Sequence, residues 1–249
     1  MENGASAAYE ERLAERREEI LERVDGALDR AGRPRDAATL LAVSKTVGVD
    51  EVVCALNVGY RVFGENRPQE LMRKLEGLAA VPGLPACRFD MIGNLQRNKI
   101  NAVLGRAELI HSVRSLHLAE GVSERVLRRC EAGEMSGPQP VLLEVNVSGE
   151  ASKSGFAPDE LRAHMDELLE LRGISIEGLM TMAPQGRRDV ARACFAGLRE
   201  LRDELSCSSG LPLAQLSCGM SEDFEEALEE GSTLIRLGRV VFDPAFEVR

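Results

Sequence analysis

Residues 39–63 read TLLAVSKTVGVDEVVCALNVGYRVF, and this stretch contains one complete strand–helix–strand unit. The apolar run at 39–44 predicts a buried strand, the pattern at 49–57 predicts a helix, and a second strand-like run occupies 60–63. Alternation of strand and helix indicates parallel strands, because parallel neighbours must be joined by a crossover connection. The stretch therefore predicts an α/β protein.

The same alternation continues along the chain to residue 237. Strand-like runs lie near 39–44, 60–63, 88–92, 108–112, 140–147, 174–180, 213–217 and 233–237. Helical patterns fill the gaps, near 49–57, 66–78, 94–104, 115–131, 158–171, 188–206 and 222–230. Eight strand–helix units can close into a barrel, so we expect a single (β/α)8 TIM barrel.

An additional helix precedes the first strand. Residues 7–31 place their apolar side chains on one helical face, namely Leu13, Ile20, Leu21, Val24 and Leu28. Residues 238–249 are too few for a good crossover helix and a tail, so we expect the N-terminal helix to fill the place of the last barrel helix. The expected organisation is one domain over 1–249, with the helix at 1–35, the barrel at 39–242 and no second domain.

The charge balance argues against two classes of partner. Lys and Arg number 31 and Asp and Glu number 41, which gives a net charge of −10 with no basic block. Nucleic acid and anionic membranes are therefore not expected partners. No apolar stretch reaches the roughly 20 residues that span a bilayer, and the N-terminal sequence lacks the apolar core of a signal peptide. We expect a soluble, cytoplasmic protein.

The cysteines and histidines do not form a recognisable metal or disulfide motif. None of the six cysteines makes a Cys-x-x-Cys pair, and none of the three histidines is followed four positions later by a ligand-type residue. Neither a zinc site nor a disulfide framework is expected.

Lys45 stands where the first strand emerges into a loop, which is the active face of such a barrel. At the rim of an apolar interior its amine is expected to be partly desolvated, which favours the nucleophilic free base. Such an amine can form a Schiff base with an aldehyde. The alternative is that Lys45 extends into water where its strand ends.

Polar residues also follow the other strands at the same end of the barrel. They fall at 64–66, 93–99, 146–155, 180–184, 217–221 and 236–239. Several have a structural alternative: 64–66 could be a turn and helix cap, Asn94 a cap, 98–99 a solvated face, 221–223 the start of a helix, and Glu150 with Lys153 a surface pair.

Arg236 is harder to explain structurally, because it lies inside the apolar strand TLIRL. A buried guanidinium needs an acceptor or a ligand. Gly238 allows backbone to approach a ligand closely, and Ser217 with backbone amides could hold a phosphate between the seventh and eighth loops, the usual phosphate position in these barrels.

Seven motifs in order resemble those of the pyridoxal phosphate homeostasis proteins, single-domain relatives of the barrel half of alanine racemase. They lie between Leu41 and Phe242 and read AVSKT, FGEN followed by QE, MIGNLQRNK, VNVSGEASKSG, GLMTMAP, LSCGMSEDFEEAL and GSTLIRLG. The resemblance covers nearly the whole chain and implies that pyridoxal 5′-phosphate is the cofactor.

The resemblance also implies residue roles. Lys45 would carry the cofactor as a Schiff base, Arg236 would face the pyridine nitrogen, and Lys153 would assist cofactor transfer. Phosphate would be held by Ser217, Gly238 and Arg239, and the rest of the cofactor would be contacted by Asn66, Ile92 and Met220. Departures from the family pattern occur at Asp90, Met91, Arg114, Cys218, Arg239 and Asp243.

An arginine opposite the pyridine nitrogen leaves that nitrogen largely unprotonated, because a guanidinium can only donate. The ring is then a weaker electron sink. A racemase of this lineage takes a second acid/base from a further domain, which we do not expect here, and Tyr9 and Tyr60 lie away from the active face. We expect a monomeric carrier and buffer of the cofactor in its cellular homeostasis, with apo-enzymes as possible recipients.

Three alternatives remain open. The first is a racemase of the alanine racemase type that uses the same cofactor. The second is a barrel aldolase in which Lys45 attacks a sugar-phosphate aldehyde, although no acid/base partner is evident beside it. The third is a barrel without catalysis that serves as an interaction scaffold.

Overall fold

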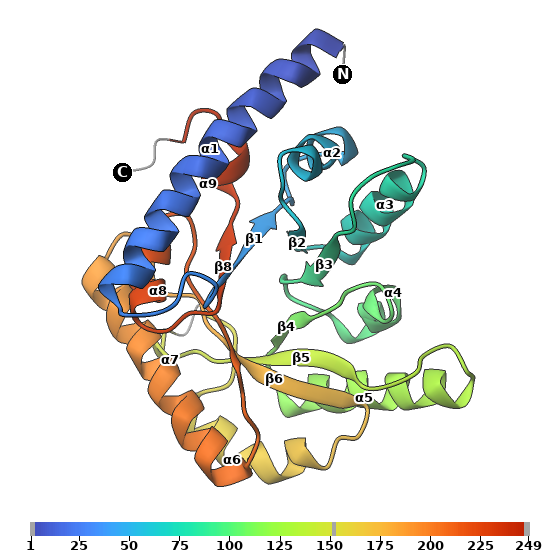
Figure 1. Ribbon diagram of the computed structural model, residues 1–249. Helices are drawn as coiled ribbons and strands as arrows, with labels where there is room; N and C mark the ends of the chain where they lie inside the picture. The colour runs from blue at the N-terminus through green and yellow to red at the C-terminus, as the bar shows by residue number, and fades with distance from the viewer. Residues whose placement is uncertain (1–2, 151–152, 247–249) are drawn as a thin grey trace.

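The computed structural model describes residues 3–150 and 153–246, and across them eight parallel strands close into a barrel in chain order (Figure 1). The strands are β1 (Thr39–Val43), β2 (Val62–Glu65), β3 (Arg88–Met91), β4 (Ile110–Val113), β5 (Gln139–Glu144), β6 (Ile174–Met180), β7 (Gln215–Ser217) and β8 (Leu234–Leu237). β1 pairs with both β2 and β8, which closes the ring. The predicted (β/α)8 barrel is confirmed, and each of the eight predicted strands is present.

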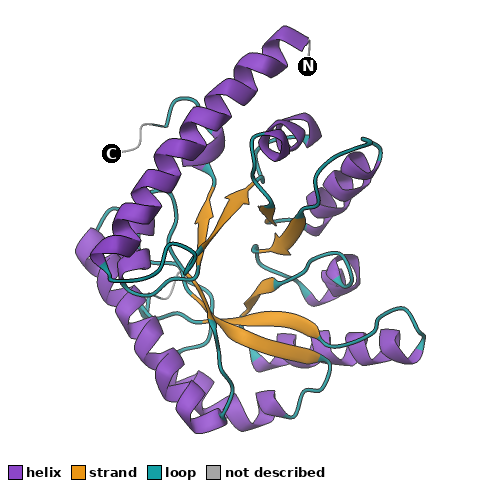
Figure 2. Ribbon diagram, in the orientation of Figure 1, coloured by secondary structure: helices purple, strands orange, loops and turns teal. Residues whose placement is uncertain are grey.

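Helices surround the barrel, with the strands inside and the helices outside (Figure 2). They are α1 (Asn3–Arg30), α2 (Val49–Asn57), α3 (Pro68–Ala79), η1 (Arg97–Lys99), α4 (Ile100–Val103), α5 (Leu116–Glu131), α6 (Pro158–Leu169), α7 (Arg188–Ser209), α8 (Phe224–Glu229) and α9 (Arg239–Phe242). None of the helices described is both long and apolar enough to cross a membrane.

Helix α1 lies between α8 and α2, which is the place that a crossover helix after β8 would take (Figure 1). Its inner face buries Leu13, Ile20, Val24, Ala27 and Leu28. The expectation that this helix fills the last position of the outer ring is therefore confirmed.

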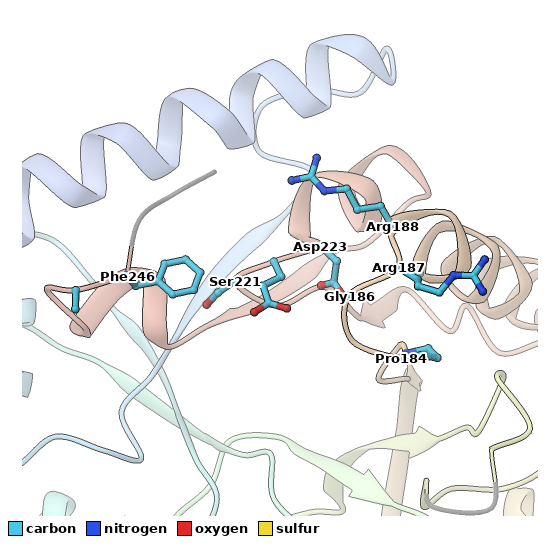
Figure 3. A pocket seen from close by; sticks show the side chains of 10 residues that line it. Pro184, Gly186, Arg187, Arg188, Ser221, Asp223 and Phe246 are labelled. Atoms are coloured by element: carbon cyan, nitrogen blue, oxygen red, sulfur yellow. The ribbon is translucent and has the colours of Figure 1, made fainter.

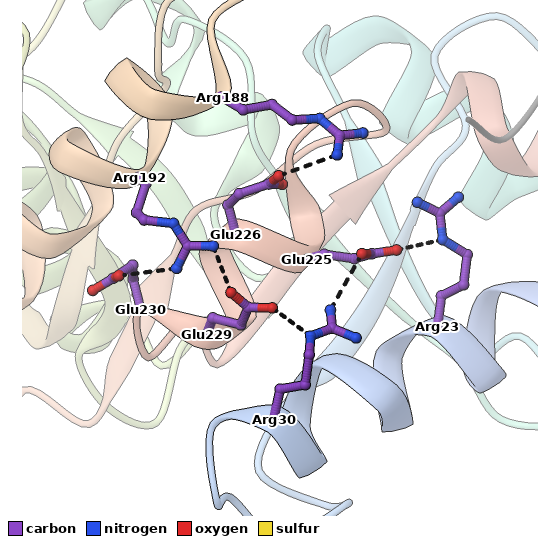
Figure 4. A network of polar contacts seen from close by, with 8 residues as sticks. All are labelled: Arg23, Arg30, Arg188, Arg192, Glu225, Glu226, Glu229 and Glu230. Atoms are coloured by element: carbon purple, nitrogen blue, oxygen red, sulfur yellow. Dashed lines mark hydrogen bonds and ion pairs between the residues drawn. The ribbon is translucent and has the colours of Figure 1, made fainter.

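Ion pairs also hold α1 in place (Figure 4). Arg23 and Arg30 of α1 pair with Glu225 and Glu229 of α8, and Arg192 of α7 pairs with Glu229 from the other side. These pairs join three helices that are consecutive around the ring, although α1 is far in sequence from α7 and α8. Each pair contributes little by itself because it is partly solvated, so the buried apolar face carries most of the stabilisation.

Successive residues of a strand point alternately into the barrel and out toward the helices, and this alternation decides which polar residues of the strands lie inside the barrel. Leu142, Met180 and Leu234 form a small buried cluster inside the barrel, whereas their strand neighbours Leu143 and Ile235 belong to the large cluster between strands and helices. Several inward positions nearer the carboxyl ends of the strands are polar, among them Asp90, His111, Glu144, Ser217 and Arg236.

Candidate functional site

A cavity of about 460 Å³ opens at the carboxyl ends of the strands. Seven of the eight residues predicted to bind the cofactor line it: Lys45, Asn66, Ile92, Met220, Arg236, Gly238 and Arg239. They come from the ends of β1, β2, β3, β7 and β8, which are brought together only because the strands are parallel. The active-face interpretation of these clusters is therefore supported by their placement.

Lys45 follows β1 at the cavity wall, and it is exposed. Its amine has no hydrogen-bond or ion-pair partner among residues 3–150 and 153–246. The expected partial desolvation is thus wrong, because Lys45 lies two residues beyond the end of β1, after the buried Ser44. The amine is instead open to a molecule that enters the cavity.

A buried ion pair fixes the backbone just before Lys45. Lys74 of α3 and Glu65 of β2 are both fully buried and paired, and the Lys74 ammonium also donates to the carbonyl oxygen of Ser44. The Ser44 hydroxyl donates to Glu65 Oε1 at 2.6 Å. The end of β1 is therefore held by side chains of β2 and α3, which limits where Lys45 can go.

Asn66 is available to the cavity because it does not cap a helix. Strand β2 extends to Glu65, further than predicted, and Arg67 is the N-cap of α3. A Cβ atom at Gly93 would lie 2.2 Å from the carbonyl oxygen of Asn66, so only glycine permits this close approach of the two loops. The alternative of a turn and cap at 64–66 is wrong for Asn66.

Two further alternatives are also corrected. Asn94 does not cap a helix, since Gln96 is the N-cap of η1, and Asn94 instead lines the cavity. Helix α8 begins at Phe224 after Asp223. Asp223 is its N-cap, so the predicted helix start is right for Asp223, whereas Ser221 and Glu222 belong to the loop after β7; all three line the cavity.

Arg236 enters the cavity from below and carries a buried charge. It is 5% exposed, and it donates to the Ser217 hydroxyl at 2.6 Å and to the carbonyl oxygen of Thr181 at 3.0 Å. Burial lowers the pKa of its guanidinium. No carboxylate forms an ion pair with Arg236 within the described part of the chain. Its three remaining N–H groups are free to meet a ligand.

Ser217 is the one predicted cofactor residue that does not line the cavity. It is fully buried, and its hydroxyl lies between Arg236 and His111. This corrects its expected position, because Ser217 is still within β7 and points into the barrel. Ser221, four residues later, lines the cavity and accepts a hydrogen bond from the amide of Val240 in α9 at 3.3 Å.

Gly238 and Arg239 begin the short helix α9 at the rim of the cavity. The Arg239 guanidinium pairs with Glu222 at 2.6 Å and lies 5.0 Å from the centre of the Phe246 ring. Arg239 is therefore near the loop of Ser221, with its charge partly balanced by a neighbour.

Sequence reasoning missed Glu144, which lines the cavity from the end of β5. Glu144 is 1% exposed; its Oε1 accepts a hydrogen bond from Ser154 at 2.5 Å, and its Oε2 has no hydrogen-bond partner within residues 3–150 and 153–246. Burial raises the pKa of this carboxyl, and the Ser154 hydrogen bond opposes the shift. A single Glu within the strand-like run at 140–147 was the only signal available.

Lys153 does not line the cavity. It is half-buried, and its backbone amide donates to the carbonyl oxygen of Glu150 at 3.0 Å, so the described contact with Glu150 is not a side-chain ion pair. Residues 151 and 152 of the same motif lie outside the described residues.

A second, larger cavity of about 640 Å³ lies beside the first and shares Ser221, Glu222 and Asp223 with it (Figure 3). Phe246 and Pro184 contribute to its wall, and Arg187 turns away from Phe246. It contains neither Lys45 nor Arg236, so the smaller cavity holds the reactive groups.

Comparison with known proteins identifies this arrangement. The family model described as alanine racemase, N-terminal domain, matches residues 18–244. A pyridoxal phosphate homeostasis protein of Aquifex aeolicus is 40% identical over 230 residues, covering 92% of this chain and 96% of that protein. The chain belongs to the pyridoxal phosphate homeostasis protein family.

Solved structures agree with this assignment. PipY of Synechococcus elongatus, a structure with PLP bound, has a TM-score of 0.77 and 32% sequence identity to this family member, and the match covers 92% of this chain and 99% of PipY. A protein of unknown function from Bifidobacterium adolescentis has a TM-score of 0.84 and 38% identity, with 94% and 96% covered. The family likeness therefore extends over the whole barrel.

Proposed function

We propose that this protein binds pyridoxal 5′-phosphate in the 460 Å³ cavity and acts as a carrier and buffer of the cofactor. The observation that carries the proposal is the position of Lys45 and Arg236 in one wall: an open amine and a buried cation with only neutral partners. The bound cofactor supplies an aldehyde, with which the Lys45 amine condenses to a Schiff base with loss of water. The PLP-bound structure of PipY supports the choice of ligand.

The chain's residues fit the rest of the cofactor. Arg236 can donate to an unprotonated ring nitrogen, because it lines the cavity and three of its N–H groups have no hydrogen-bond partner within the described residues. Asn66, Ile92 and Met220 would contact the ring or its substituents. Each of these three lines the same cavity.

For the phosphate we assign the loops after β7 and β8. Ser221 replaces Ser217 in this role, together with the backbone of Gly238 and Arg239. An anion at this position would gain hydrogen bonds from amides at the start of α9, and Arg239 could turn from Glu222 toward it.

The direct test uses the purified protein with added pyridoxal 5′-phosphate. We expect an absorption band of a Schiff base, and after borohydride reduction the mass of the cofactor on the peptide that contains Lys45. Lys45→Ala should lose both signals, and Lys99→Ala, a second lysine at this end of the barrel that does not line the cavity, should keep them. Labelling of the Lys45→Ala variant at the wild-type level would contradict the proposal.

A second candidate function, amino-acid racemase, is favoured by Glu144. A buried acid of raised pKa in the cavity wall is a possible proton donor or acceptor besides Lys45. If racemisation occurs, we expect Glu144→Gln to reduce it while leaving borohydride labelling of Lys45 intact. If wild type racemises amino acids no faster than Lys45→Ala does, the racemase function is excluded and the carrier function stands.

As a carrier the protein is proposed to act as a monomer of one domain that can pass the cofactor to apo-enzymes. Lys153 lies in the loop after β5, close in sequence to Ser154, which contacts Glu144 at the cavity. Its proposed role in transfer is tested by Lys153→Ala. We expect that variant to bind the cofactor normally and to release it to an apo-enzyme more slowly.

A further inference from the structure

A chain of polar side chains crosses the barrel interior beneath the cavity. Arg236 of β8 donates to Ser217 of β7 at 2.6 Å, Ser217 Oγ lies 2.9 Å from His111 Nδ1 of β4, and His111 Nε2 lies 3.2 Å from Asp90 Oδ2 of β3. Asp90, His111 and Ser217 are fully buried. All four occupy inward positions of their strands, so they are isolated from the helices.

The chemistry of these groups gives the hydrogen bonds one direction. The Asp90 carboxylate can only accept, so the ring proton of a neutral His111 lies on Nε2, where it is donated to Asp90. Nδ1 is then unprotonated and accepts from the Ser217 hydroxyl, whose oxygen accepts from the Arg236 guanidinium. Burial lowers the pKa of His111, which favours this neutral ring.

We propose that Asp90 and His111 are positioning residues for the bound cofactor, acting through the Ser217 hydroxyl to fix the guanidinium of Arg236. This inference rests on the proposed function, since it concerns the group that Arg236 meets in the cavity. Asp90 selects the imidazole tautomer, the tautomer orients the Ser217 hydroxyl, and the hydroxyl and the Thr181 carbonyl together hold two N–H groups of Arg236. The remaining N–H groups are thereby directed at the ring nitrogen of the cofactor.

The first test needs no cofactor. The chain has three histidines, so ¹⁵N NMR of histidine-labelled protein can resolve the His111 ring. We expect the Nε2–H tautomer in wild type and in Asp90→Asn, whose amide oxygen still accepts a hydrogen bond. In Asp90→Leu we expect this tautomer to lose its dominance. An Nδ1–H tautomer in wild type would overturn the inference.

The second test measures affinity and absorption with pyridoxal 5′-phosphate. We expect Asp90→Leu to weaken binding about tenfold, as when one hydrogen bond to a charged group is lost, and Asp90→Asn to stay within about threefold. The absorption band of the bound cofactor should shift in Asp90→Leu and not in Asp90→Asn. Leu142→Met, a volume-conserving change inside the barrel, is the matched control and should leave both unchanged.

Ser217→Ala provides an independent variant if Asp90→Leu fails to fold, and we expect it to show the same shift and loss of affinity. Identical absorption and affinity in wild type, Asp90→Leu and Ser217→Ala would overturn the positioning role. Borohydride labelling of Lys45 in wild type separates the two ideas. If wild type is not labelled at Lys45, the proposed function fails. If wild type is labelled but the absorption band of the variants does not shift, only the positioning role is refuted.

Discussion

Lys74 and Glu65 form an ion pair that is completely shielded from water, and the Lys74 ammonium reaches past it to the carbonyl of the residue that precedes Lys45. Two charges are thus buried between the barrel and α3 to hold the end of one strand. The pair places a structural lysine close to the one with a proposed chemical role.

We expect Lys74→Met to destabilise the protein by about 3–5 kcal/mol, because it leaves the Glu65 carboxylate buried without its counter-ion. The double variant Lys74→Met with Glu65→Leu removes both charges and should be more stable than Lys74→Met alone. Urea unfolding monitored by circular dichroism gives both values. Equal stability of the single and double variants would show that the isolated carboxylate costs nothing.

Arg236→Met should separate binding from stability. Cofactor affinity is expected to fall at least about tenfold. The free energy of unfolding without added cofactor should change by no more than about 2 kcal/mol, because the loss of two hydrogen bonds is offset by the removal of a buried charge that has no ion pair. Titration followed by absorbance and thermal unfolding measure the two effects. Arg236→Lys, which keeps the charge but not the planar fork, should also bind weakly.

Acidification should destabilise the protein through His111. Burial lowers its pKa, so the folded state binds fewer protons than the unfolded state below the ordinary value of about 6.5, and stability falls as the pH falls. Between pH 6.5 and 5 this loss is at most about 2 kcal/mol for one proton. His111→Gln should lose less stability over the same interval in urea titrations. A parallel pH dependence for the two proteins would exclude His111 as the cause.

The attachment of α1 should depend on its apolar face rather than on its charges. We expect Ile20→Ala, which empties a fully buried position, to cost about 2–5 kcal/mol. Arg30→Ala removes two ion pairs, to Glu225 and Glu229, at a half-exposed side chain and should cost less than about 1 kcal/mol. Equilibrium unfolding in urea compares the two variants. A larger loss of stability for Arg30→Ala than for Ile20→Ala would show that the charges, rather than the apolar face, hold α1 in place.

The architecture could be predicted from the sequence because each strand is a short apolar run and each is followed by a helical pattern. The cavity residues followed from the same alternation, since carboxyl ends of parallel strands share one face. The residues at which the strands end were harder to predict from the sequence. Ser217 and Ser221 lie in one motif, and only the point at which β7 ends decides that the first faces the barrel interior and the second the cavity.

The polar networks could not be predicted in this way. Lys74 and Glu65 lie on different elements, and His111 meets Ser217 across 106 positions of sequence. No local pattern encodes the His111–Ser217 contact, because it depends on the register of β4 and β7 across the barrel. Glu144 was missed for a related reason: a carboxyl at a strand end resembles a solvated residue until its burial is known.

The position of α1 has a consequence for synthesis on the ribosome. Arg23 of α1 pairs with Glu225, 202 positions later, so the helix emerges long before the surface that receives it. Its apolar stripe must remain uncovered, or be covered by temporary contacts, until β8 and α8 have been translated. Completion of the ring is therefore a late, non-local event.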